Sequence, residues 1–295
     1  VMNKRIFTLV FTLVFALIIA LSLCSCVDQH AGKKNSNKDE KKIIATSPAT
    51  VEICNKLKIK LIAVPESSFT MSDEYKDLPK IGSPMSPDIE KIKSLNPDYV
   101  LSPVSLKNEL EKKYKNAELK YEFINLSSVD GMFDSIKKLG DKFGHEKEAN
   151  ALIDEHKQYM KKFNSSIKGK KRPKVLVLMG LPGSYVIATD KSYVGSLVKL
   201  AGGENVYTDD SKDFLTVNTE DMKTKNPDII LRASHAMPDD VKSMFAKEFA
   251  ENDIWKHFDA VKNGKVHDLD NTLFNMSANF NYRDALEELR KLLYE

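Results

Sequence analysis

The sequence predicts an α/β protein made of two similar lobes with central sheets, which a long backbone helix joins. Three observations lead to this fold class. A helix–turn–strand pattern occurs twice, at residues 87–101 and 217–231. A helical tract lies between the two copies, at residues 131–171. Short apolar strands alternate with helical patterns on both sides of that tract, which is typical of α/β folds.

The repeated pattern is centred on the tripeptide Asn-Pro-Asp, at residues 96–98 and 226–228. In each copy a helical segment with a glutamate near its start, Glu90 or Glu220, precedes the tripeptide, and a short apolar strand follows it. These three residue types are common in turns, so the tripeptide alone is weak support. The matching order and spacing of glutamate, helix, turn and strand favour duplicated lobes.

The tract between the copies carries apolar residues at helical spacing, including Phe133, Ile136 and Leu139. From Gly131 to Ile167, little apart from Gly140 and Gly144 would break a helix. We therefore expect a stiff backbone helix rather than a flexible hinge, with a ligand in the cleft between the lobes. The expected boundaries are 42–130 for the N-terminal lobe, 131–171 for the backbone helix and 172–295 for the C-terminal lobe.

Length and charge restrict the classes of function. The chain has 295 residues, enough for two lobes with cores of their own. Its formal charge is +3, and removing Lys4 and Arg5, the charged residues among the first 25, leaves +1. This near-neutral balance gives no reason to expect nucleic acid as a partner.

Residues 1–25 form a targeting segment of the lipoprotein signal type. The basic pair Lys4-Arg5 precedes a long apolar run, as in a signal peptide. The run ends in Leu-Cys-Ser-Cys at residues 23–26, which resembles a bacterial lipobox with Cys26 as the lipidated residue.

Cys24 departs from the residues usual at its lipobox position, and the apolar run is also long enough for an uncleaved anchor helix. Either interpretation places the chain at the extracellular face of the bacterial cytoplasmic membrane, anchored to it. Residues 26–41 are polar and predict a flexible tether. The third cysteine, Cys54, lies on a helical pattern and is expected to pack in the core.

Two side chains are candidate metal ligands. His235 follows a predicted strand at residues 228–231, in a loop with Arg232. Ligands of open α/β sheets bind at such strand ends, and an imidazole suits a metal such as haem iron. Met237 lies two residues beyond His235 and competes with it as a ligand. Met85 lies in a loop bracketed by prolines, on no periodic face. Each has an ordinary alternative: a histidine that hydrogen-bonds backbone, or a methionine that fills a core gap.

Together, the repeat, the lipobox and the helical tract resemble the helical-backbone class of substrate-binding lipoproteins, which serve ABC importers of haem, siderophores and cobalamin. Within that class the chain is similar to haem-binding lipoproteins of the iron-regulated surface determinant system. The stretches that carry the resemblance are at residues 75–77, 81–85, 182–185, 188–193 and 252–258.

The resemblance implies that haem (haem b) is the transported ligand. Its iron would be held by Met85 from the first lobe and His235 from the second. The partners would be an ABC permease with its ATPase and upstream cell-surface haem donors, and we expect a monomer. Glu90 and Glu220 would each pair with an arginine of the permease, although glutamates in a first helical turn also favour the helix dipole.

The haem propionates need anion sites, and exposed N–H groups at helix starts can supply them. Ordinary capping explains the same residues equally well. The candidates are Thr46, Ser47, Ser67, Ser68, Ser184 and Tyr185.

Two other functions remain open. A ferric-siderophore or cobalamin receptor of the same class would make Met85 incidental. A surface metal-dependent hydrolase that uses His235 would need two or three further ligands beside it. We do not expect an enzyme, because the sequence contains no nucleophile-elbow, zincin or phosphate-loop motif.

Overall fold

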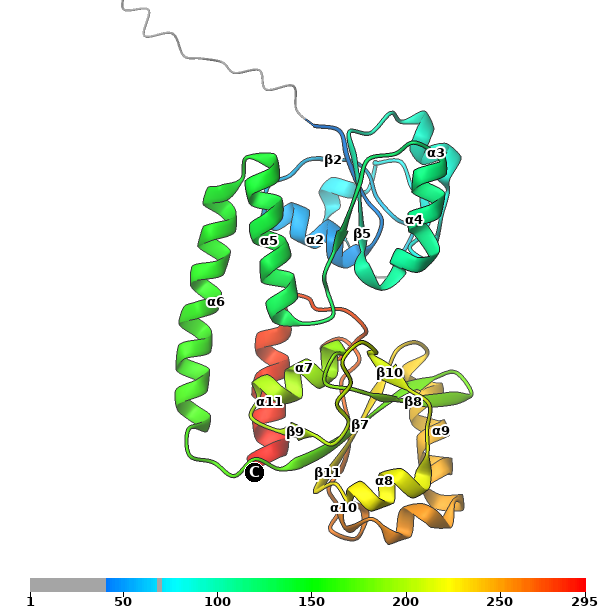
Figure 1. Ribbon diagram of the computed structural model, residues 1–295, viewed down its shortest axis with the longest axis vertical. Coiled ribbons are helices and arrows are strands. Elements are labelled where there is room, and N and C mark those ends of the chain that lie inside the picture. The colour runs from blue at the N-terminus through cyan, green and yellow to red at the C-terminus, as the bar shows by residue number, and fades with distance from the viewer. Residues whose placement is uncertain (1–40, 68–70) are drawn as a thin grey trace, which may run out of the picture. The chain divides into compact units, whose positions relative to one another are not determined.

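The computed structural model describes residues 41–67 and 71–295, which form two α/β lobes (Figure 1). The lipobox, most of the predicted tether and Ser68 lie outside these residues. In the first lobe a four-stranded parallel sheet has the order β2–β1–β5–β6. Its strands are β1 (Ile43–Ala45), β2 (Leu61–Ala63), β5 (Tyr99–Pro103) and β6 (Tyr121–Ile124), and its helices are α2 (Pro48–Lys56), α3 (Ile89–Ser94) and α4 (Lys107–Asn116).

The first-lobe sheet is buried on both faces. Ile43 and Ala45 pack into one apolar cluster and Ile44 into another, because successive side chains of a strand point to opposite faces. Cys54 is buried in the first of these clusters, where burial raises the pKa of its thiol to about 12. The smaller elements of this lobe are two 3₁₀ helices, η1 (Asp73–Tyr75) and η2 (Val104–Leu106), and a hairpin of β3 (Gly82–Ser83) and β4 (Ser86–Pro87).

The second lobe contains a six-stranded mixed sheet in the order β10–β8–β7–β11–β12, with β9 also paired to β7. Its strands are β7 (Lys174–Leu181), β8 (Ser184–Ala188), β9 (Glu204–Asn205), β10 (Phe214–Leu215), β11 (Ile229–Ser234) and β12 (Val266–Asp268). The helices are α7 (Tyr193–Leu200), α8 (Thr219–Lys225), α9 (Pro238–Glu251), η3 (Asp253–His257), α10 (Asp259–Lys262) and α11 (Tyr282–Tyr294).

The repeated tripeptide builds the same corner in both lobes. Asn96 and Asn226 have positive φ angles of 46° and 40°, a left-handed conformation that asparagine tolerates. The Asp98 carboxylate accepts a 2.8 Å hydrogen bond from the N–H of Lys42, which immediately precedes β1. Asp228 accepts a 2.7 Å bond from the N–H of Lys174, the first residue of β7. Each corner therefore ties the start of one strand to the start of its neighbour.

The expected single backbone helix is wrong, because two helices occupy the tract. The first, α5 (Val129–Phe143), ends at Gly144, whose φ of 78° is left-handed. The second, α6 (Glu146–Ile167), packs against α5. A Cβ on Gly140 would lie 2.5 Å from the Cβ of Ala149, so the close approach of the helices requires glycine there. The two glycines thus make a helical hairpin.

Contacts among α5, α6 and α11 join the lobes (Figure 1). The ring of His156 on α6 stacks on Phe133 of α5, with ring centroids 4.1 Å apart and planes 16° apart. His156 Nδ1 lies 2.9 Å from the hydroxyl of Tyr282 on α11. Close by, the N–H of Ala278 donates a 2.8 Å hydrogen bond to the carbonyl of Leu126. We call Phe133, His156 and Tyr282 the aromatic joint.

None of the helices in the described part of the chain combines the length and the apolar character that a membrane span requires.

The aromatic joint should weaken in mild acid. Desolvation lowers the pKa of His156, so the folded protein favours the neutral ring. Between that lowered pKa and the ordinary value of about 6.5, the unfolded chain binds more protons. The free energy of unfolding should therefore fall as the pH falls through this window.

Denaturant titrations of wild type and His156→Gln across pH 5–8 measure this contribution. The wild type should lose more stability than the variant on acidification. Equal pH dependence of the two proteins would contradict the assignment.

Candidate functional site

Met85 lies in the turn between β3 and β4 of the first lobe. The N–H of Glu66 bonds the carbonyl of Gly82 at 2.8 Å, and the N–H of Asp88 bonds the carbonyl of Ile81 at 2.8 Å. The first bond ties the hairpin to the segment that follows β2, and the second closes the base of the hairpin. Met85 itself is 72% exposed. A core gap-filling role is therefore ruled out, and the thioether is available to a ligand.

His235 directly follows β11, as predicted, although this strand extends to Ser234. Its N–H donates a 3.1 Å hydrogen bond to the carbonyl of Gly180 in the neighbouring β7. The imidazole is exposed and has no hydrogen bond or ion pair within residues 41–67 and 71–295. Surrounding protein lowers its pKa by desolvation, which favours the neutral ring that binds metals. The backbone of His235 is therefore held in place, while its imidazole ring has no hydrogen-bond partner among the described residues.

Arg232 was expected in the loop beside His235, and this expectation is wrong. It lies within β11 opposite Asp268 of β12, and its guanidinium donates to both carboxylate oxygens at 2.8 and 2.7 Å. The same group lies over the rings of Phe245 and Phe249. Arg232 therefore cross-links sheet and helix, and its charge is already paired.

Met237 differs from the other methionines in the described part of the chain in its backbone conformation. It has a φ of 45°, a left-handed conformation that costs a residue with a side chain roughly 1–2 kcal/mol. It occupies the N-cap position of α9 without a capping hydrogen bond from its side chain. That side chain is 57% exposed. Neither packing nor capping explains a methionine at this position.

Two of the first-lobe candidates for an anion site, Thr46 and Ser47, already make hydrogen bonds within the protein. Thr46 is buried and donates a 2.8 Å hydrogen bond to Ser102. Ser47 caps α2 by accepting from the N–H of Thr50, as expected. Ser67 is exposed, but no described helix begins there. The hydroxyls of Thr46 and Ser47 therefore serve the fold.

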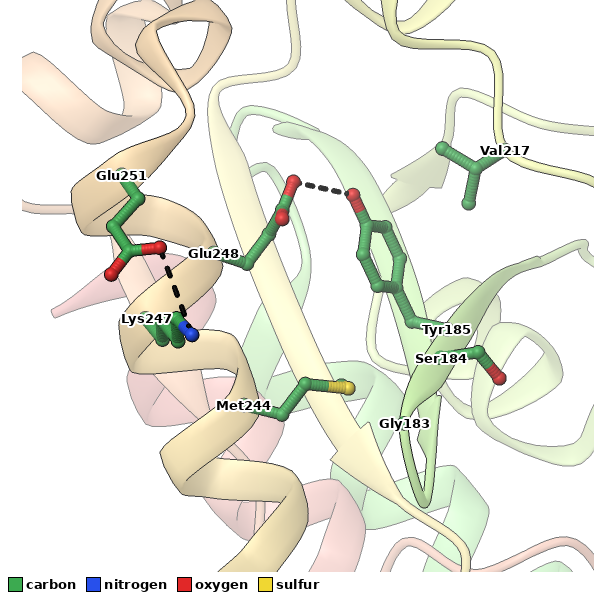
Figure 2. Close-up of a pocket in the computed structure, with 8 residues that line it drawn as sticks. All are labelled: Gly183, Ser184, Tyr185, Val217, Met244, Lys247, Glu248 and Glu251. Atoms are coloured by element: carbon green, nitrogen blue, oxygen red, sulfur yellow. Dashed lines mark hydrogen bonds and ion pairs between the residues drawn. The ribbon is translucent and has the colours of Figure 1, made fainter.

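Ser184 and Tyr185 form part of strand β8 rather than a helix N-terminus, so the reason for expecting an anion there does not apply. They line a pocket of about 400 Å³ between the β7–β8 hairpin and α9 (Figure 2). Tyr185 donates a 2.9 Å hydrogen bond to Glu248, which also accepts from Trp255 and Asn252. These donors lower the pKa of Glu248, although its partial burial acts to raise it. The negative charge here opposes propionate binding.

Sequence reasoning assigned no role to Glu248. Its hydrogen-bond partners come from different elements: Tyr185 lies in β8, Asn252 directly after α9 and Trp255 in η3. The remaining residues around the pocket are Gly183, Val217, Met244, Lys247 and Glu251.

Glu90 and Glu220 occupy the same place in the two repeats, in the first turns of α3 and α8. Asp88 caps α3 and Asn218 caps α8, so capping does not need the glutamates. Both carboxylates are exposed, and neither has an ion pair or a side-chain hydrogen bond among the described residues. They are two uncommitted negative charges, one on each lobe.

Within the described residues, no group of three or more His, Cys, Asp or Glu side chains could hold a metal ion. A hydrolytic metal centre needs about three protein ligands, and His235 has no such neighbours. Haem brings four nitrogens of its own, so one donor from the protein on each face suffices.

Comparison with known proteins identifies the class. The model of the periplasmic binding protein family matches residues 43–273. The chain belongs to the periplasmic binding protein family. The α/β fold class and the family resemblance predicted from the sequence are thereby confirmed.

Among periplasmic binding proteins, the chain is 43% identical over 274 residues to the high-affinity heme uptake system protein IsdE of Staphylococcus aureus (strain bovine RF122 / ET3-1). That alignment covers 92% of this chain and 94% of the relative. An ABC transporter substrate-binding protein from Listeria monocytogenes has a crystal structure that matches with a TM-score of 0.82 and 47% identity, over 86% of this chain and 99% of that one. The crystal structure of S. aureus IsdE complexed with heme matches with a TM-score of 0.81 and 45% identity, over 87% and 100%.

Proposed function

We propose that this chain is an extracytoplasmic haem-binding lipoprotein that delivers haem to an ABC importer permease for iron acquisition. One observation carries the proposal. Met85 and His235 are uncommitted metal donors, held on fixed backbone at the edges of different lobes. The relatives named for heme uptake and for a heme complex support haem as the cargo.

The two donors fit haem iron in chemical type. A neutral imidazole binds iron strongly, and a thioether as the second axial ligand favours the reduced state. With both axial positions filled, no position is left open for oxygen chemistry, which suits a carrier. In this proposal haem bridges the two lobes in the cleft between them, with one donor on each face.

Most of the residues predicted from the sequence to bind the haem propionates are not suited to that role, so the propionates need other partners. Exposed lysines and backbone N–H groups of the loops can serve, whereas the pocket at Glu248 repels carboxylates. Of the six residues first considered, Ser184 and Tyr185 lie in strand β8, and the hydroxyls of Thr46 and Ser47 serve the fold.

Membrane attachment is a separate part of the proposal. We infer lipidation at Cys26, which places the protein at the extracellular face of the cytoplasmic membrane, where it works as a monomer that accepts haem from surface donors. Mass spectrometry of protein extracted from the membrane should find the lipid on Cys26. A protein still carrying residues 1–25 would contradict this and favour the uncleaved anchor helix.

The axial ligands can be tested by substitution. We expect His235→Ala to lose most haem, and Met85→Ala to leave a five-coordinate or water-ligated species. Loss of a mere hydrogen-bond partner of a metal ligand already costs about 10–100-fold in affinity. Loss of the ligand itself should cost at least as much.

Haemin titrations followed by the Soret and charge-transfer bands measure both effects. His257→Ala is the matched control, because this exposed histidine lies on η3, away from the strand end. If both ligand variants keep the wild-type bands, the assignment is wrong. If the wild-type protein binds a ferric siderophore or cobalamin but not haemin, haem is not the cargo.

The docking role of Glu90 and Glu220 gives a further prediction. Exposed ion pairs contribute on the order of 0–1 kcal/mol each, so either single alanine variant should weaken transport only in part. The double variant should abolish haem-dependent growth while haem binding in solution stays normal.

Glu109→Ala/Glu204→Ala is the matched control, since it removes one exposed carboxylate from each lobe at other sites. Growth like that of the wild type in Glu90→Ala/Glu220→Ala would reject docking through these residues. Reduced haem binding in that variant would instead assign the glutamates to the site or the fold.

A further inference from the structure

Exposed methionines are rare in this protein. Within residues 41–67 and 71–295, the large hydrophobic side chains exposed to solvent are Met85 at 72% and Met237 at 57%. Water disfavours an exposed apolar side chain of this size, and packing holds neither residue in place. Met85 is accounted for as an axial donor. Met237 carries the same thioether group as Met85, and it lies two residues after His235, the other proposed axial donor.

The backbone at Met237 adds a second, independent observation. Its φ of 45° is positive, as at Asn96 and Asn226. Met237 differs from the other described non-glycine residues with positive φ because it precedes a helix, at the N-cap of α9. The others end or follow helices, and they are Lys58, Asn96, Glu118 and Asn226. Methionine does not favour this conformation. Strained residues of this kind cluster at functional sites. The left-handed turn at Met237 lets the chain pass from His235 into α9 while the thioether stays in solvent.

We propose that Met237 is an alternative axial donor, which takes the iron position of His235 when the imidazole is not coordinated. This inference rests on the proposed haem-binding function. In the exchange the bond from iron to the imidazole nitrogen breaks and a bond from iron to the Met237 sulfur forms. Both donors are neutral and each supplies one electron pair, so the exchange changes neither the charge nor the oxidation state of the iron.

Chain geometry decides which donor Met237 can replace. Residues two apart in sequence are separated by at most about 7 Å of backbone. The haem ring lies between its axial ligands, and so short a segment cannot reach round the edge of the ring to both faces. Met237 therefore binds on the face of His235, opposite Met85, and never across the iron from His235.

An alternative axial donor at Met237 would affect how haem enters and leaves the protein. A haem that loses the imidazole would stay six-coordinate through two thioethers, Met85 and Met237. Two thioethers hold ferric iron less firmly than a thioether and an imidazole, and they favour ferrous iron further. The second methionine would thus provide a weaker, intermediate bound state between full ligation and release.

The test compares His235→Ala with His235→Ala/Met237→Leu, both saturated with haemin, in the ferric and the dithionite-reduced forms. Leucine keeps the apolar volume and removes the sulfur. Spin state is measured by visible absorption and magnetic circular dichroism, and affinity by titration. His235→Ala should remain six-coordinate and low-spin, and the double variant should become high-spin with at least tenfold weaker binding. His235→Ala/Met244→Leu, which removes a different thioether of α9, should match His235→Ala.

Two outcomes would overturn the inference. One is the same spin state in His235→Ala and His235→Ala/Met237→Leu. The other is the same loss of low-spin haem in the Met244 control. A wild type that binds no haemin would reject the proposed function itself, and the inference with it. Far-ultraviolet circular dichroism of each variant separates loss of a donor from loss of the fold.

Discussion

The aromatic joint is the contact on which the rest of the structure depends. Met85 belongs to one lobe and His235 to the other, so a metal held by both requires a constant spacing between lobes. Phe133, His156 and Tyr282 provide it by packing α5, α6 and α11 together. Each aromatic pair contributes about 0.5–1.5 kcal/mol beyond its buried area. The stiffness expected from one long helix is supplied instead by a helical hairpin packed against the last helix.

The side chains of the two proposed donors, Met85 and His235, are kept free because hydrogen bonds of the backbone hold the segments that carry them. The hairpin that carries Met85 is held at Gly82 and Ile81, and the strand end that carries His235 is held at Gly180. Neither side chain takes part in these bonds. A carrier needs this arrangement, because the side chains that bind its cargo must not already be engaged in hydrogen bonds or packing within the protein.

Much of the fold followed from local patterns in the sequence. The Asn-Pro-Asp corners, the Ser47 cap and the strand before His235 depend on neighbouring residues, so the sequence alone predicts them. The break at Gly144 was missed because a glycine can lie within a helix or end it, and the packing of Gly140 on Ala149 decides the matter. Arg232 was misplaced because its partner, Asp268, is distant in sequence. Glu248 was missed because Tyr185, which donates a hydrogen bond to it, is distant in sequence.

A crystal structure of the haemin-loaded protein would show the axial ligands and the packing of the lobes together. We expect the sulfur of Met85 and an imidazole nitrogen of His235 to bind the iron on opposite faces of haem. We also expect the lobes to keep the contacts of the aromatic joint unchanged. Haem bound through any other pair of residues, or a joint broken in the loaded form, would contradict these expectations.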